Sequence, residues 1–175
     1  MRFTLEGLTI YCTNLIGAIS LDQKSILECP QTKTTRGIMT PVKRINHIAI
    51  VVDEIEDALH FWRDALGLRV ARVEEVPDQD SVVAFLSVGN MEIELVKPTS
   101  DESGIARYIK KRGPGIHHIC FEVDDIKASL ESLKAKSVRL INSEPVIGTS
   151  GKRFAFIHPE STYGVLVELY ELPPK

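Results

Sequence analysis

The sequence lacks three features that would direct it to particular classes of protein. It has no cluster of basic residues long enough to follow a phosphate backbone, and its net charge is −3, so nucleic acid is not an expected partner. It has no apolar run near the roughly 18 to 20 residues that cross a membrane. Its three cysteines, Cys12, Cys29 and Cys120, are odd in number and widely spaced. That pattern is typical of neither a disulfide framework nor a C-x-x-C zinc site, so we expect a reducing compartment.

The apolar residues make up 43% of the 175-residue chain, which is enough for a hydrophobic core. The length fits one domain or two small fused modules. We therefore expect a globular protein with no membrane partner.

The beginning of the chain stands apart, because residues 1–38 join a moderately apolar run to a polar, threonine-rich stretch. Transit peptides are basic and poor in acids, whereas Glu6, Asp22 and Glu28 are spread through this segment. We expect Met39 to be the natural start and residues 1–38 to be an upstream extension or a loosely held tail. The expected location is the cytoplasm, or the mitochondrial matrix if residues 1–38 are a targeting peptide.

Two β-strand stretches repeat one pattern, INHIAIVV from Ile45 to Val52 and GIHHICFEV from Gly115 to Val123. The repeat aligns His47 with His118. Side chains alternate between the two faces of a strand, so each histidine shares a face with a small residue while bulky apolar residues fill the opposite face. Each strand therefore presents an imidazole on a face that has room for another group.

A helix is predicted after each of these strands. The first opens at Asp53, with Glu56 completing a capping box, and ends near Gly67; the second opens at Asp124. Their apolar stripes lie at matching offsets from the two histidines and consist of Ile55, Leu59, Trp62 and Leu66 in the first helix and of Ile126, Leu130 and Leu133 in the second. These matching offsets predict an internal duplication.

Three short strands are predicted after each helix. They cover Arg69–Val76, Ser81–Val88 and Met91–Val96 in the first copy, with a hairpin turn at Gly89-Asn90, and Arg139–Val146, Lys152–His158 and Gly164–Tyr170 in the second. A short helix over Ile105–Lys111 joins the copies. The predicted domain spans residues 39–175, with module 1 at about 44–98, a connector at 99–114 and module 2 at about 115–171.

The last strand of each module carries one acid inside an apolar run, Glu94 in MEIELVKP and Glu168 in GVLVELYE. A buried carboxylate needs a cation, a hydrogen-bond network or exposure. A lone histidine or glutamate on a strand is more often satisfied locally, but unrelated surface residues have no reason to recur at matching places. We therefore predict one divalent-metal site with His47, Glu94, His118 and Glu168 as ligands, suited to zinc, manganese, iron, cobalt or nickel.

The remaining histidines are assigned other roles. His117 lies one residue out of phase with His118 and is expected to be structural, pointing to the opposite face of the strand. His158, at a strand end, is expected to be either structural or pocket-lining. His60 is expected on the polar, solvated side of its helix.

These features resemble the vicinal oxygen chelate superfamily, which includes glyoxalase I, the extradiol dioxygenases and the methylmalonyl-CoA epimerases, and among these they are most similar to the epimerases. The resemblance covers nearly all of residues 44–171 through INHIAIVV, FWRDALGL, DESGIARYIKKRG, GIHHICFEVDDI, EPVIGTSGKRFAFIHP and GVLVEL. It implies an α+β fold of tandem βαβββ modules in an open, cupped mixed sheet with the helices outside. It also implies one divalent metal, Co2+ first and Mn2+, Zn2+ or Ni2+ as alternatives, and a homodimer.

The activity that this resemblance implies is the interconversion of (2R)- and (2S)-methylmalonyl-CoA through an enolate, in propionyl-CoA and succinyl-CoA metabolism. A metal would act as a Lewis acid on the enolate, and a base is needed on each face of the substrate. Glu94 and Glu168 are candidates for base work as well as ligation. Lys152 and Arg153 are candidate contacts for the anionic acyl-CoA.

The sequence departs from the epimerase pattern at three positions. Many bacterial epimerases have glutamine in place of Glu94, and some carry a proposed catalytic glutamate on the third strand of the module, where Ala84 stands at the expected position. Glu160 occupies a place where the family often has lysine, which weakens contact with an anionic substrate. The identity of the base is therefore open.

Three competing functions follow from the same fold. Glyoxalase I is the nearest enzyme alternative; the connector and the FIHP run favour the epimerase, while Glu94 is neutral between them. An extradiol dioxygenase uses two histidines and one carboxylate, so the second acid argues against it. A non-catalytic binding module of the antibiotic-resistance type commonly lacks the metal ligands, and all four are present here.

Overall fold

A computed structural model describes residues 41–148 and 151–173. The predicted N-terminal segment of residues 1–38, and with it the choice of start, lies outside the described residues. No helix in the described part of the chain has the length and apolar character needed to cross a membrane.

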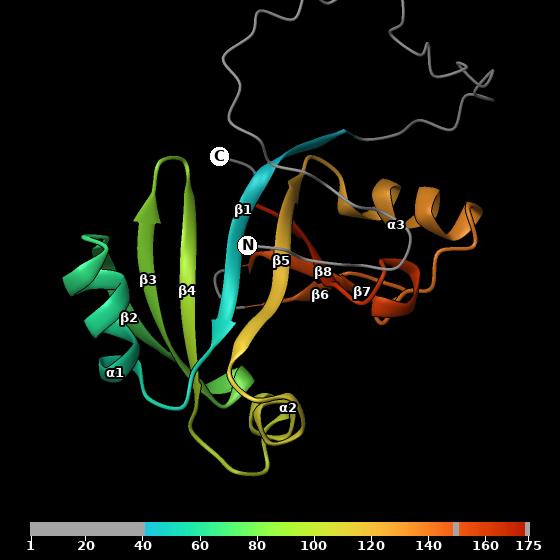
Figure 1. The fold of residues 1–175 in the computed structure, drawn as a ribbon. Coiled ribbons are helices and arrows are strands. Elements are labelled where there is room, and N and C mark those ends of the chain that lie inside the picture. Colours follow the sequence, from blue (N-terminus) through green and yellow to red (C-terminus); the bar gives the residue numbers. More distant parts are fainter. Residues whose placement is uncertain (1–40, 149–150, 174–175) are drawn as a thin grey trace, which may run out of the picture. The chain divides into compact units, whose positions relative to one another are not determined.

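Eight strands form one mixed sheet in the order β2-β3-β4-β1-β5-β8-β7-β6 (Figure 1). The strands are β1 (Val42–Val51), β2 (Arg69–Val76), β3 (Ser81–Val88), β4 (Met91–Pro98), β5 (Gly115–Val123), β6 (Val146–Ile147), β7 (Arg153–Ile157) and β8 (Leu166–Glu171). The main helices are α1 (Ile55–Leu59), continued by a π-helix over His60–Ala65, α2 (Gly104–Arg112) and α3 (Ile126–Ala135). This confirms the predicted pair of βαβββ modules in an open mixed sheet.

The two modules repeat one strand topology. In module 1, β1 is parallel to β4, and in module 2, β5 is parallel to β8 in the same way. The modules join where β1 and β5 run antiparallel at the centre of the sheet, as Figure 1 shows. The arrangement is a quasi-two-fold repeat, so equivalent residues of the two copies come close together only near this central pair.

Each module buries its own helix-side core. Module 1 packs Ile55 and Leu59 of α1 onto the sheet, and module 2 packs Ile126 and Leu130 of α3 in the same way. A third cluster lies on the other face of module 1, where α2 covers the end of the strands, and includes Ala49, Val51, Val83, Phe85 and Val96. The bulky faces of the central strands therefore point to the helices, as predicted, and leave the histidine faces for the site.

The two helices begin differently from the prediction. The N-cap of α1 is Glu54 rather than Asp53, and its side chain makes no capping hydrogen bond to any described residue. In module 2 the N-cap is Asp125 rather than Asp124, and its carboxylate accepts a hydrogen bond from the Ala128 N–H at 3.0 Å. In both cases two acids are adjacent in the sequence, and the sequence pattern does not show which of the two is the N-cap.

The end of the first helix also corrects the predicted apolar stripe. The Leu66 N–H donates to the Phe61 carbonyl, five residues back, as in a π-helix. These wider turns rotate later side chains away from the α-helical stripe, so Leu66 is 53% exposed while Leu59 is 2% exposed. The predicted end of the helix near Gly67 is confirmed.

Most predicted strands agree with the structure, and those over Arg69–Val76 and Ser81–Val88 have the predicted bounds. The strand predicted over Arg139–Val146 is wrong. Of its residues, only Leu140 forms an isolated bridge, to Ile157, before β6 begins at Val146. The side chain of Asn142 accepts the Phe156 N–H at 2.9 Å in place of a strand carbonyl.

Candidate metal centre

The two repeated histidines meet at the centre of the sheet. Their ring nitrogens Nε2 lie 3.0 Å apart, with the rings nearly perpendicular at 74°. His47 stands opposite Cys120, and His118 opposite Ala49, across the antiparallel β1–β5 pair. Both of these small neighbours are fully buried. The small residues leave the space in which the two imidazoles approach one another.

Glu168 on β8 completes a buried cluster of three. Its Oε2 atom lies 3.1 Å from Nε2 of His47 and 3.0 Å from Nε2 of His118. Burial disfavours the charged carboxylate, but the hydrogen bonds with His118 and His47 outweigh burial and lower the pKa of Glu168 to about 2. Glu168 is therefore a carboxylate at neutral pH, held between two imidazoles.

This cluster fits a divalent metal ion. The ligand atoms of His47, His118 and Glu168 all lie within 4.8 Å of one another. Donors about 2.1 Å from one ion and at right angles around it lie about 3.0 Å apart, which matches the three separations of 3.0, 3.0 and 3.1 Å. Two imidazoles and one carboxylate suit zinc, manganese, iron, cobalt or nickel. The three side chains form a possible site for such an ion.

Glu94, the fourth predicted ligand, lies beside this cluster on β4. Its Oε1 atom is 3.3 Å from Nδ1 of His47, the ring nitrogen that faces away from His118. Burial raises the pKa of Glu94. The structure thus brings three of the four predicted ligands to a common point and places Glu94 in contact with the first of them.

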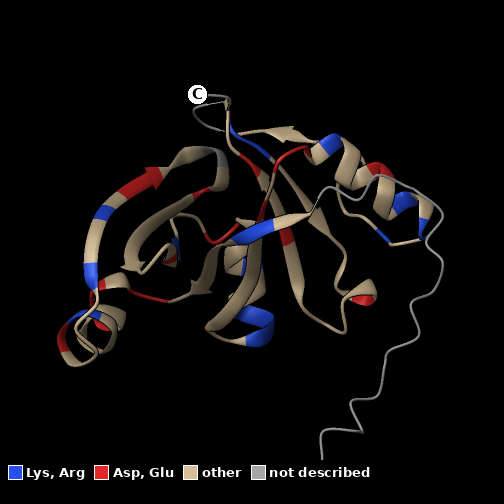
Figure 2. Ribbon diagram, turned by 90° about the horizontal axis from the view of Figure 1, so that it is seen from above, with Lys and Arg blue, Asp and Glu red and all other residues tan. Residues whose placement is uncertain are grey.

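A second layer of polar side chains holds His47. The Asn46 side-chain oxygen lies 3.0 Å from Nδ1 of His47, and the Asn46 amide donates to Glu122 at 3.3 Å. Glu122 is 4% exposed and pairs with Lys43 at 3.2 Å and with Arg44 at 2.7 Å. The blue band at the start of β1 in Figure 2 marks this basic pair. Together these contacts fix the orientation of the His47 ring.

The pKa of His47 reflects both layers. Burial opposes the imidazolium, but the hydrogen bond with Glu168 and the negative charge of Glu94 outweigh burial and raise the pKa. The sequence analysis did not single out Glu122, although it is an acid in the apolar run CFEV. An acid inside an apolar run was part of the signal that identified Glu94 and Glu168, but Glu122 has no matching acid in module 1, where Val51 stands at the equivalent position.

The predicted direction of His117 is wrong, because its ring lies against the outer side of the His118 ring and not on the opposite face of the strand. On β1, Ala49 pairs with His118 and the next residue, Ile50, pairs with Ile116. His117 therefore has no partner on β1 and is the extra residue of a β-bulge. A bulge interrupts the alternation of faces, and the Nδ1 atoms of His117 and His118 lie 2.9 Å apart. Burial, helped by the charge of His118, lowers the pKa of His117 to about 4. A neutral His117 therefore stands behind His118 at neutral pH.

The two predicted substrate contacts lie in different surroundings. Arg153 pairs with Glu171, whose other oxygen accepts the Ile126 N–H at the start of α3 at 2.8 Å. Lys152 places its Nζ 5.6 Å from the ring centre of Tyr170. Arg153 is engaged in a structural contact, whereas Lys152 lies beside a ring on the face of the site.

The remaining positions have structural roles. His158 accepts the Glu160 N–H at 3.1 Å and so caps a short 3-10 helix, which is the structural alternative of the prediction. The His60 ring is exposed and lies 3.3 Å from Asp64, as expected for a solvated face. Ala84 is fully buried in the helix-side core, so an acid at this position would point away from the metal site.

Two phenylalanines on the face of the site were missed by the sequence analysis. Phe85 stands directly opposite Glu94, and Phe156 directly opposite Glu168, across the β3–β4 and β7–β8 pairs. The Phe156 ring lies 5.5 Å from the His118 ring. The signal was present, since Ala-Phe followed by Leu or Ile occurs at Ala84 and again at Ala155.

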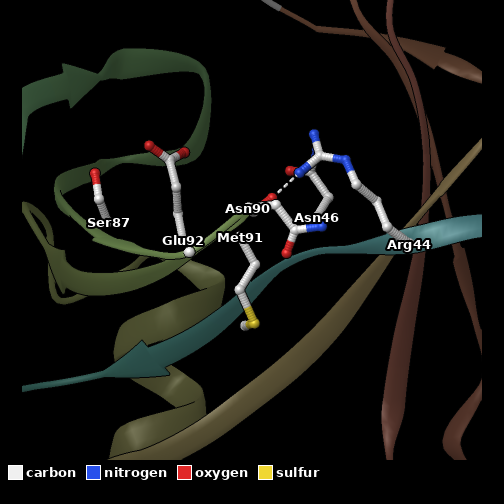
Figure 3. Close-up of a pocket in the computed structure, with 7 residues that line it drawn as sticks. Arg44, Asn46, Ser87, Asn90, Met91 and Glu92 are labelled. Carbon is white, nitrogen blue, oxygen red and sulfur yellow. Dashed lines mark hydrogen bonds between the residues drawn. The ribbon is translucent and has the colours of Figure 1, made fainter.

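A cavity of about 280 Å³ lies in module 1, between residues of β1 and of the β3–β4 hairpin (Figure 3). The Arg44 guanidinium reaches the Asn90 carbonyl across it. Its lining is polar apart from Met91 and consists of Arg44, Asn46, Ser87, Gly89, Asn90, Met91 and Glu92.

The fold and the cluster together define a class of protein: two βαβββ modules in one sheet with a possible metal site between their central strands. Residues 46–156 match the Glyoxalase/Bleomycin resistance protein/Dioxygenase superfamily. The chain belongs to this superfamily.

Within this superfamily, the chain is similar to several methylmalonyl-CoA epimerases. The chain is 36% identical to the mitochondrial methylmalonyl-CoA epimerase of Homo sapiens over 163 residues, covering 89% of this chain and 93% of that one. It is 41% identical to the ethylmalonyl-CoA/methylmalonyl-CoA epimerase of Cereibacter sphaeroides over 133 residues, covering 75% and 99%. A solved methylmalonyl-CoA epimerase in complex with methylmalonyl-CoA and NH4+ superimposes with a TM-score of 0.69 at 31% identity, covering 75% of this chain and 95% of that one. Similarity to the lactoylglutathione lyase of Haemophilus influenzae is weaker, at 25% identity over 122 residues.

Proposed function

We propose that the protein is a methylmalonyl-CoA epimerase, which removes the α-proton from one face of the thioester and returns a proton to the other. The observation that carries the proposal is the buried cluster of His47, His118 and Glu168. It lies between the central strands of a chain that is similar over most of its length to epimerases of this substrate. The chemistry is a proton transfer and needs no second substrate.

The site suits the abstraction of a weakly acidic proton. A divalent metal held by His47, His118 and Glu168 would supply positive charge that stabilises the enolate formed when the α-proton leaves. Asn46 and His117 hold the outer nitrogens of the two rings, so that both Nε2 atoms face the site. The low exposure of all three members of the cluster limits the access of water, which strengthens charge interactions there.

The two carboxylates have separate roles in this proposal. Glu94 and Glu168 come from equivalent strands of the two modules, so they approach the site from its two sides. Glu168 lies between the imidazoles and acts as a ligand and as the base on one face. We assign Glu94, which contacts only the outer nitrogen of His47, as the base on the other face and as the fourth ligand.

The substrate, metal and assembly are proposed at a finer level. The substrate is an acyl-CoA ester; of its two predicted contacts, Lys152 is the better placed, because Glu171 already engages Arg153. Co2+ is the proposed native metal, with Mn2+, Zn2+ and Ni2+ as alternatives, since imidazole and carboxylate ligands accept all four. The proposed assembly is a homodimer.

The proposed location is the cytoplasm, with the mitochondrial matrix as the alternative. One finding supports the alternative: the alignment with the mitochondrial human relative covers 89% of this chain, more than residues 39–175 can supply. It therefore extends into the predicted N-terminal segment. Fractionation of cells of the native source distinguishes the two locations, because a start at Met39 and removal of a targeting peptide would both shorten the chain and give similar masses.

The activity is tested by proton NMR in D2O with methylmalonyl-CoA, which follows loss of the α-proton signal. We expect exchange with the Co2+-loaded protein, none after chelation, and loss of exchange in His118→Ala. The matched control is His60→Ala. His60 is an exposed histidine at the start of the π-helix that follows α1, and its removal leaves the three ligands in place.

Absence of exchange with Co2+, Mn2+, Zn2+ and Ni2+ each supplied in turn would overturn the proposal. In that case the same samples are assayed with the hemithioacetal of methylglyoxal and glutathione. Isomerisation of this compound would identify a glyoxalase I.

A further inference from the structure

The metal cluster is flanked by a matched pair of aromatic residues that the mechanism has not used. VAFL in β3 and FAFI in β7 place Phe85 and Phe156 at the same point of the two modules. The preceding residues, Ala84 and Ala155, are both fully buried in the helix-side cores. The alternation of a strand therefore directs both phenylalanines to the opposite face, which is the face of the site.

The register places each ring beside one of the two candidate bases. Phe85 is the cross-strand partner of Glu94, and Phe156 is the partner of Glu168. Directly opposed residues of an antiparallel pair have Cβ atoms about 4.5 to 5.5 Å apart and share a face. Each carboxylate thus has an apolar wall next to it, on the side away from the central strands.

The two walls are similar in position but not in surroundings. The Phe156 ring meets the His118 ring edge to face, with centres 5.5 Å apart at 82°. The Phe85 ring is 9% exposed, and the Arg72 guanidinium lies 3.6 Å above its centre. Arg72 is itself held by Glu92 at 2.8 Å. The Phe85 ring therefore has Arg72 over one of its faces, whereas the Phe156 ring borders the cluster directly.

We propose, on the basis of the epimerase function above, that Phe85 and Phe156 receive the alkyl group of the two epimers in turn and limit its size. In one epimer the α-proton faces one module and the alkyl group leans toward the other. In the opposite epimer these positions are exchanged. A site that handles both epimers needs an apolar surface on each side, and the duplicated phenylalanines supply it.

The first test separates the two walls by stereochemistry. Phe85→Leu and Phe156→Leu keep the apolar character but shorten the side chain, and initial rates are measured from (2R)- and from (2S)-methylmalonyl-CoA. We expect each variant to raise the KM for one epimer about tenfold, and the two variants to affect opposite epimers. Because the equilibrium constant fixes the ratio of kcat/KM in the two directions, the ratio of kcat in the affected direction to kcat in the reverse direction must rise by the same factor.

The second test concerns the size of the alkyl group. Phe156→Ala opens a larger space, and we expect the ratio of kcat/KM for ethylmalonyl-CoA to that for methylmalonyl-CoA to rise about tenfold. The matched control is Phe121→Leu, since Phe121 packs on the helix-side core of module 2. It should leave both KM values and the size preference unchanged.

The outcomes distinguish this inference from the proposed function. Suppose that the wild-type protein epimerises methylmalonyl-CoA. If each leucine variant then changes the KM values for the two epimers equally, or leaves them as in the Phe121→Leu control, the inference that the two phenylalanines receive the alkyl group is wrong. If Phe156→Ala does not fold, the two leucine variants still decide. If the wild-type protein shows no α-proton exchange, the epimerase proposal itself fails.

Discussion

Modules 1 and 2 share one topology, but their two equivalent carboxylates sit in different environments. Glu168 lies 3.0 to 3.1 Å from both Nε2 atoms, and its pKa is lowered to about 2. Glu94 reaches only Nδ1 of His47, and burial raises its pKa. Equivalence in sequence therefore does not carry over to charge. Duplication supplied two acids, and local contacts made one a ligand and left the other more basic.

The helices of the two modules differ in the same way. α3 begins with a side-chain cap from Asp125, whereas α1 begins without one among the described residues and passes into a π-helix. Both nevertheless bury one leucine almost completely, Leu59 at 2% and Leu130 at 1% exposure. The buried positions preserve the repeat, while the helix ends do not.

The largest expected effect separates the two carboxylates. Glu168→Gln removes the charged member of the His-His-Glu cluster, and we expect it to abolish stoichiometric metal binding and reduce α-proton exchange about 1000-fold. Glu94→Gln leaves that cluster intact and should retain the metal while reducing exchange about 100-fold through loss of a base. Metal content after dialysis and the exchange rate measure the two effects. Equal loss of metal in both variants would show that the carboxylates are equivalent.

The next effect compares the two cores. Leu59→Ala and Leu130→Ala each leave a cavity in a fully packed helix-side cluster, and we expect each to lower the free energy of unfolding by about 3 kcal/mol. Urea denaturation followed by circular dichroism measures it. Leu66→Ala is the control, because Leu66 is exposed, and its effect should stay within about 0.5 kcal/mol. A small effect at Leu59 alone would mean that the π-helix leaves module 1 loosely packed.

A smaller effect depends on pH and belongs to the network behind His47. Burial raises the pKa of Glu122, but hydrogen bonds from Lys43, Arg44 and Asn46 outweigh burial and lower it. Such a carboxyl contributes stability above its unfolded pKa of about 4.3, which is lost as the pH falls through the folded value. Glu122→Gln should cost about 2 kcal/mol at pH 7, with the difference from wild type shrinking below about pH 4.

Unfolding free energies of both proteins, measured from pH 7 to pH 3, test this. A constant difference across the range would show that the charge of Glu122 contributes nothing. Module 2 has no equivalent of Asn46, because His117 precedes its histidine, so this network belongs to module 1 alone.

The smallest effect concerns the helix caps. Asp125→Ala removes the bond to the Ala128 N–H and should destabilise the protein by about 1 kcal/mol. Asp53→Ala, the change at the cap predicted from the sequence, should cost less than about 0.5 kcal/mol. Thermal unfolding midpoints compare the two. Similar losses would indicate that Asp53 caps α1 in solution.

The duplication could be predicted from the sequence, because apolar residues recur at the same spacing in both copies. That spacing is kept because each copy packs its own helix on its own strands. The same reasoning located His47, His118 and Glu168. It failed at His117, because a single bulge shifts the faces of a strand without changing the local pattern. It also failed over Arg139–Val146, where Asn142 replaces a strand hydrogen bond with a side-chain contact. Apolar periodicity does not report either event.

The antiparallel pairing of β1 with β5 has a consequence for the chain as a whole. The cluster takes His47 from one half and His118 and Glu168 from the other, so neither half contains it alone. A polypeptide divided between Thr99 and Ser103 would yield two fragments, each with its own helix-side core, that recover a complete site only by reassociating along this seam. In this respect the protein resembles a dimer whose two subunits are joined in one chain, with the site at the interface between the two modules.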